Sequence, residues 1–198
     1  MTSPWQRALG SRYDELDARL RDYFGEIPQG RVGRGSGVFE VAGSRKRWLW
    51  PVLAILALDG VAFPAWQRDV AFTVTNRRAR HGTVQAKRFF DFAERGWVMT
   101  DEIGMTSAGL TDRIGRNGLL SATLEPTVVD GALVLRSTGM TFRLGGIRIP
   151  LGILSPRLAL VERADADRQH VSLRLSLPFV GTVYEYSGRF RYAIEADD

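Results

Sequence analysis

Alternation of apolar and polar residues, from Asp69 almost to the C-terminus, is the feature that most limits how this chain can fold. In stretch after stretch every second residue is apolar, as in Val70, Phe72 and Val74. Successive side chains of a strand point to opposite faces of a sheet, so the pattern predicts strands with one buried face. Short turns, such as the one at Asn117-Gly118, separate these stretches and require neighbouring strands to be antiparallel.

The number of these stretches predicts the fold class. Between residues 69 and 194 we expect about nine or ten strands. A sheet of this length curls or closes, because open edges invite aggregation. The sequence therefore predicts a mainly β (α+β) protein, built as a strongly curved antiparallel sheet or a β-barrel, with two helices near the N-terminus.

The first of these helices is predicted over residues 4–24. Ser3 and Gln6 form a capping-box pattern around Pro4, and Gly25 is the expected stop. A stripe of apolar residues runs along the segment at steps of three and four: Leu9, Tyr13, Leu16, Leu20 and Phe24. A short strand is expected near 37–42 and the second helix, which is apolar along most of its length, over 44–58.

Composition and charge limit the class of protein. The chain has 198 residues, of which 44% are hydrophobic and 25% charged, which is ordinary for a globular protein, and we expect one domain spanning 1–198. It has no cysteine, which excludes disulfides and thiol catalysis. The net charge of +5 is spread along the chain, so we expect no nucleic-acid partner.

Targeting and membrane segments are not expected either. The first residues lack the basic start and apolar run of a signal peptide. The longest apolar run, Trp48 to Leu58, is shorter than the roughly 20 residues that a spanning helix needs, so we expect no transmembrane segment. We expect a cytoplasmic protein without a cofactor. Two separated histidines, His81 and His170, form no recognisable metal site.

A few charged residues lie on the apolar side of the predicted strands. Arg88 falls in the apolar set of residues 84–92, Asp101 in that of 97–105 and Arg136 in that of 132–142. Glu162 is in line with Leu158 and Leu160, although less clearly. Burying an unpaired charge costs several kcal/mol, so these groups must pair with one another, reach water or meet a charged ligand.

These charges suggest a ligand site inside the barrel. Arginine binds two oxygens at once, so Arg88 and Arg136 would hold the acidic head of an amphipathic molecule, with Asp101 and Glu162 orienting them. The tail would lie among apolar residues of the same strands: Phe90, Trp97, Met99, Met140 and Phe142. The alternative is a closed pair of salt bridges, Arg88 with Asp101 and Arg136 with Glu162.

Three functions are compatible with this pattern. The leading hypothesis is a non-enzymatic module that binds an apolar or amphipathic small molecule, such as a lipid-like acid. The second is an accessory domain that docks on a partner enzyme or on a membrane surface through residues 45–58, where Arg45, Lys46 and Arg47 precede Trp48 and an apolar run. The third is an enzyme with a buried carboxylate, Asp101 or Glu162, as general base.

Several stretches together resemble a known family. They are WQRALG at 5–10, GRGSGVFEV at 33–41, RLALVER at 157–163 and LPFVG at 177–181. Over about residues 4–193 the chain resembles an uncharacterised bacterial family, a domain of unknown function that occurs alone or fused behind saccharopine-dehydrogenase-like domains. The resemblance implies a bacterial cytoplasmic setting, and it brings no activity or catalytic residues.

Overall fold

The computed structural model describes residues 2–144, 147–152 and 155–197. In these residues eleven antiparallel strands form one sheet, in the order β6-β5-β4-β3-β2-β1-β11-β10-β9-β7-β8. The strands are β1 (Arg31–Gly43), β2 (Trp66–Arg78), β3 (Val84–Asp91), β4 (Gly96–Thr106), β5 (Gly109–Ile114), β6 (Leu120–Val129), β7 (Ala132–Leu144), β8 (Ile147–Pro150), β9 (Arg157–Asp165), β10 (Arg168–Leu177) and β11 (Gly181–Ala196).

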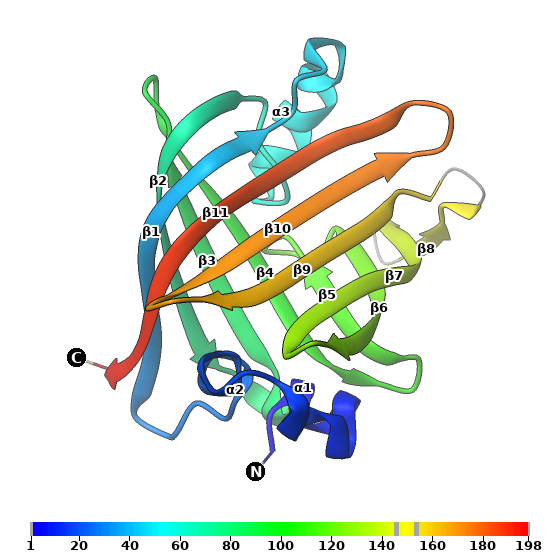
Figure 1. Ribbon diagram of the computed structural model, residues 1–198. Coiled ribbons are helices and arrows are strands. Elements are labelled where there is room, and N and C mark those ends of the chain that lie inside the picture. The colour runs from blue at the N-terminus through cyan, green and yellow to red at the C-terminus, as the bar shows by residue number, and fades with distance from the viewer. Residues whose placement is uncertain (1, 145–146, 153–154, 198) are drawn as a thin grey trace.

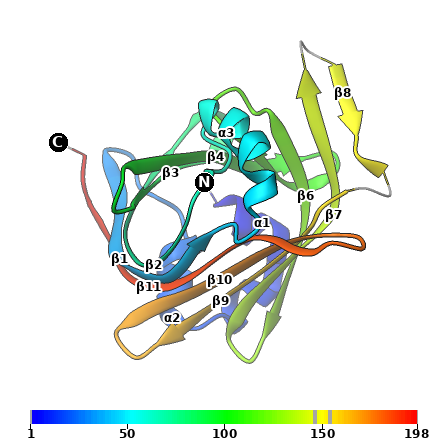
Figure 2. The same ribbon diagram turned by 90° about the horizontal axis from the view of Figure 1, so that it is seen from above.

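Pairing of β6 with β7 closes the sheet into a barrel (Figures 1 and 2). The described strands other than β8 form this ten-stranded barrel, and β8 pairs with the end of β7 outside it. Buried and exposed residues alternate along the strands, most regularly on β9. The prediction of a mainly β fold with a curved antiparallel sheet is therefore confirmed.

The N-terminal segment is helical, but it is not one helix. It consists of α1 (Pro4–Leu9), the 3-10 helix η1 (Gly10–Glu15) and α2 (Ala18–Phe24), so the prediction of a continuous helix over 4–24 is wrong. Gly10 ends α1 with a φ of +58°, and the Asp17 side chain caps α2 by accepting from Arg19 N at 2.9 Å. The predicted capping box of Ser3 and Gln6 is present.

The apolar residues predicted as one stripe are all buried despite these breaks: Leu9, Tyr13, Leu16, Leu20 and Phe24. They pack α1, η1 and α2 onto one end of the barrel, where α1 contacts β4, β5 and β6 and α2 contacts β9 (Figure 1). The segment therefore covers one end of the barrel.

The second predicted helix begins later than expected and lies at the opposite end (Figure 1). Residues 44–46 form a loop, followed by the 3-10 helix η2 (Arg47–Leu49) and by α3 (Trp50–Leu58). Pro51 lies in the first turn of α3, where its missing N–H is not needed. A further 3-10 helix, η3 (Arg80–Gly82), connects β2 to β3.

Strand β1 starts six residues before the predicted range 37–42 and includes the glycine-rich segment. A Cβ atom on Gly33 would lie 1.6 Å from the Tyr192 hydroxyl, and one on Gly35 would lie 2.8 Å from Val74. Glycine at these positions leaves room for the large side chains of the neighbouring strands β11 and β2.

Candidate functional site

The half of the barrel interior towards α3 is packed with aromatic rings. Phe63, in the loop after α3, contacts Phe90, Phe92, Trp97 and Tyr184 at centroid separations of 4.8–6.3 Å. Further rings from β1, β2 and β11 extend this group, which we call the aromatic half: Phe39, Phe72 and Tyr186. Such ring pairs stabilise a core beyond the area they bury, so this half serves as the structural core.

The half towards α1 and α2 contains a cavity of about 110 Å³. Most of its wall is aliphatic, and Trp5, Tyr23 and Phe24 from the N-terminal helices close it. Into the same space project ionisable and amide side chains from five strands: Asn76, Arg88, Asp101, Asp112 and Glu162. We call this region the cavity half.

Arg88 and Asp101 form an ion pair in the wall of the cavity. They project from adjacent strands, because Asp101 on β4 is opposite Ala86 on β3, two residues from Arg88. Burial alone would lower the pKa of Arg88, but Asp101 and the nearby Tyr186 raise it well above its usual value. The predicted inward orientation of both residues and their pairing are confirmed, so the positive charge of Arg88 is already compensated.

Asp112 is a third ionisable residue in the cavity half, and it was not predicted from the sequence. It lies on β5 between Leu110 and Ile114, which share its face. Its Oδ1 atom is buried without a hydrogen-bond partner in the described residues. Burial raises the pKa of Asp112 well above its usual value, and repulsion from Asp101 adds to the shift. The alternation Leu110-Asp112-Ile114 is the same pattern that identified Arg88.

Glu162 on β9 is 6% exposed and accepts a hydrogen bond from the Gln169 side chain on β10. Burial raises its pKa to about 7, although the Gln169 hydrogen bond and the charge of Arg88 act in the opposite direction. Its inward orientation, predicted from the alternation with Leu158 and Leu160, is confirmed. A pKa near neutrality lets this carboxyl exist in both protonation states under ordinary conditions.

Two buried amides near these carboxyls have unused acceptors. Asn76 donates to the Tyr192 hydroxyl at 3.5 Å, and Gln169 donates to Glu162, but their carbonyl oxygens have no partner in the described residues. Buried polar groups are nearly always hydrogen-bonded in folded proteins. Asn76 and Asp112 line the cavity, so its wall has two unmatched acceptor atoms, whereas Gln169 does not line it.

The predicted orientation of Arg136 is wrong, because its side chain is exposed on the outside of the barrel. On β7 the side chains of Leu133 and Leu135 are buried, so Arg136, which follows Leu135, faces outward. The pairing of β6 with β7 shifts register between Thr123–Gly139 and Leu124–Ser137, which is a β-bulge. The bulge reverses which residues face inward, so the predicted salt bridge of Arg136 with Glu162 does not form in the described structure.

The apolar residues expected around a ligand tail do not line one space. Met99 lines the cavity, whereas Phe90 and Trp97 belong to the aromatic half. Met140 is buried further along β7, and Phe142 is half-buried opposite Ile149 of β8. Of the predicted set, Arg88, Asp101, Glu162 and Met99 are therefore brought together.

The residues that line the cavity include one arginine, three carboxyls and the hydroxyl-bearing Tyr23, Thr100 and Tyr186. Among the residues that the structure describes, no group of three or more histidine, aspartate and glutamate side chains could hold a metal ion. Within the same residues, no helix is long and apolar enough to cross a membrane. A hydrogen-bond donor placed in the cavity would meet unmatched acceptors on Asn76 and Asp112.

Comparison with known proteins places the chain in a family. No curated protein and no solved structure matches it. The sequence matches the family described as Domain of unknown function (DUF4166) over residues 16–190, which is most of the chain and covers β1 to β10 and the first part of β11. The chain therefore belongs to the family Domain of unknown function (DUF4166).

Proposed function

We propose that the barrel is a binding module for a small molecule with an apolar body and a hydrogen-bond-donating head, an alcohol or an amine. The observation that carries this proposal is the pair of unmatched acceptors in the cavity wall, on Asn76 and Asp112. A buried polar atom without a partner costs roughly 1–3 kcal/mol. A ligand that supplies the missing donors would recover this free energy on binding.

The charges of the cavity half favour a donor over the acidic head considered from the sequence. Arg88 is paired with Asp101, and Arg136 lies outside the barrel. The remaining ionisable groups in the cavity wall are the carboxyls of Asp112 and Glu162, which would repel a carboxylate when ionised. An amine would be attracted to both, and a hydroxyl would hydrogen-bond to either.

The size of the cavity supports a short ligand. Its volume of about 110 Å³ lies below the roughly 300–1,000 Å³ of typical pockets for drug-sized molecules. A molecule of a few carbon atoms fits this space as it stands. A fatty-acid chain would need several times the volume, so Trp5, Tyr23 and Phe24 would have to move away from the barrel end.

The proposal is tested with three ligands of equal chain length: n-butylamine, n-butanol and butyrate. We expect the amine and the alcohol to raise the thermal unfolding midpoint in a concentration-dependent way, since each binds only the folded state. Butyrate should have little effect at neutral pH. A larger shift with butyrate would contradict the donor head, and no shift with any of the three would contradict the proposal.

Two alanine variants provide a matched control for the place of binding. Ala86 lines the cavity, so Ala86→Leu should fill it and abolish the shift with n-butanol. Ala159 on β9 is exposed on the outside, so Ala159→Leu should leave the shift unchanged. Equal shifts in the two variants would place the ligand elsewhere. Because we propose binding without chemistry, n-butanol should be recovered unaltered after long incubation.

A further inference from the structure

Helix α3 has an unusual exposed face, because it is apolar on nearly every side. Leu53 is its buried residue, at 8% exposure. Val52, Ile55 and Leu58 are 54%, 66% and 76% exposed, and Trp48 in the preceding turn is 63% exposed. A helix that packs on a barrel normally turns a polar face to water. The side chains on the exposed face of α3 therefore do not pack against the barrel.

A second apolar residue projects from the same end of the barrel. Phe179, in the turn between β10 and β11, is fully exposed and has a φ of +63°. That conformation is strained for a bulky side chain and would suit glycine or asparagine better. The phenyl ring contributes no burial that would offset the strain, so its presence favours a role outside the fold.

The loop before η2 lies beside the first part of β11, the strand that follows this turn, at the α3 end of the barrel (Figure 1). The Arg45 side chain, just before η2, lies 3.7 Å from Glu185 near the start of β11. Residues of the loop before η2 and of the first part of β11 line a common surface groove. Trp48, Val52, Ile55, Leu58 and Phe179 thus lie on two protrusions at the same end of the barrel, which together we call the apolar end surface.

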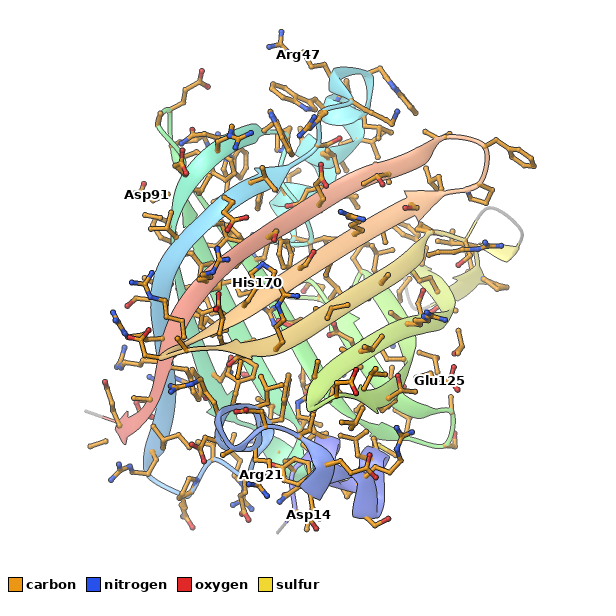
Figure 3. The ribbon with its side chains drawn as sticks, viewed as in Figure 1. Asp14, Arg21, Arg47, Asp91, Glu125 and His170 are labelled. Carbon is orange, nitrogen blue, oxygen red and sulfur yellow. The ribbon has the colours of Figure 1, made fainter. Side chains whose placement is uncertain are left out.

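Positive charge accompanies this surface. Arg45, Lys46 and Arg47 precede Trp48, and no acidic residue occurs between Arg45 and Leu58. Figure 3 shows Arg47 projecting away from the α3 end, with Asp14 and Arg21 at the opposite end. Arginine over an aromatic ring, as Arg47 lies over Trp50 at 5.6 Å, keeps the cation beside the apolar side chains.

We infer that the apolar end surface docks on an anionic lipid bilayer. Apolar side chains on a projecting helix, with tryptophan and basic residues at its base, are the combination that inserts into the headgroup region of a membrane. Anionic lipids complement Lys46 and Arg47, whereas Arg45 is already paired with Glu185. The apolar residues occupy two separate protrusions, which suits a deformable surface better than a shaped protein groove. This inference is independent of the ligand proposed for the cavity half.

Sedimentation with lipid vesicles tests the inference on the full chain. Vesicles of phosphatidylcholine mixed equally with phosphatidylglycerol should carry the protein down, and vesicles of phosphatidylcholine alone should carry down much less. Replacing Lys46 and Arg47 by glutamine should weaken partition into the anionic vesicles about fivefold for each charge removed. Failure of the unchanged protein to sediment with anionic vesicles at low salt would overturn the inference.

A pair of valine variants locates the docking surface. Val52 on α3 is 54% exposed, and Val129 at the opposite end, beside η1, is 52% exposed. Val52→Glu should weaken partition about tenfold, since a charge is costly in the interfacial layer. Val129→Glu should leave partition unchanged. Thermal unfolding confirms that each variant is folded.

Two results would contradict the docking surface. Equal losses of partition in Val52→Glu and Val129→Glu would show that docking does not involve α3. A dimer in solution that Val52→Glu dissociates, without vesicle binding by the unchanged protein, would assign the surface to a second copy of the chain.

Discussion

The two halves of the barrel interior differ although the same strands build both. On β3, Phe90 belongs to the aromatic half and Arg88, two residues away, belongs to the cavity half. On β4, Trp97 and Asp101 are divided in the same way. Tyr186 lies at the boundary, because its ring contacts Phe90 and it also lines the cavity.

The two halves therefore have different roles within one sheet: the aromatic half stabilises the fold, and the cavity half is the proposed binding site. The aromatic half is filled, and its rings contact one another at several angles. The cavity half leaves space and buried acceptors unused, both of which reduce stability. Proteins tolerate such local costs where function requires them. We therefore expect substitutions in the aromatic half to lower the free energy of unfolding strongly. Substitutions in the cavity half should lower it less or raise it.

The largest effect is expected for Phe90→Ala. Phe90 is fully buried and contacts Phe39, Phe63 and Phe72, so its removal leaves a large void in the aromatic half. We expect the free energy of unfolding to fall by about 3–5 kcal/mol, measured by chemical denaturation. The neighbouring Phe89 points outward and is 37% exposed, so Phe89→Ala is the control and should cost about 1 kcal/mol or less. Similar losses would contradict the assignment.

The ion pair of the cavity half should rank next. Arg88→Met leaves Asp101 without its cation, and breaking a buried pair in this way costs about 3 kcal/mol. The double variant Arg88→Met with Asp101→Leu removes both charges and should recover most of that loss in the same denaturation experiment. A double variant as unstable as the single one would mean that the pair itself, rather than charge balance, stabilises the barrel.

The pH dependence of stability should report Glu162. Its pKa is raised from 4.5 to about 7 in the folded state, so the folded protein holds this proton more tightly than the unfolded chain. The associated stability is present below pH 4.5 and is lost as the pH rises through 7, by about 2 kcal/mol between pH 5 and pH 8. Glu162→Gln should remove this decline. A parallel decline in both proteins would assign it to other groups.

Alternation predicted the inward residues wherever the strand is unbroken. Arg88, Asp101 and Glu162 were found because the apolar residues on either side keep the period of two. Asp112 obeys the same rule, but β5 has only six residues, so its pattern is short. Arg136 could not be placed in this way, because the bulge on β7 changes the phase without a mark in the sequence.

Contacts between segments that lie far apart in the sequence could not be predicted from the sequence alone. Gln169 and Asn76 look like ordinary polar positions, and their roles depend on Glu162 and Tyr192, which reach them through strand pairing. Phe63 lies outside the strands and yet contacts rings of three of them. Local patterns fix which face a residue occupies, whereas the register of the barrel decides which residues meet.

The smallest effect on stability is expected for Asp112→Leu in the cavity half. Replacing a buried acceptor that lacks a partner by an apolar side chain of similar size should raise the free energy of unfolding by about 1 kcal/mol at pH 7. Asp112→Asn keeps a polar group there and should change stability little. The same leucine variant should bind n-butylamine more weakly, because the donor head loses its acceptor. A large destabilisation would instead make Asp112 part of the structural core, and the division between the two halves would fail at this residue.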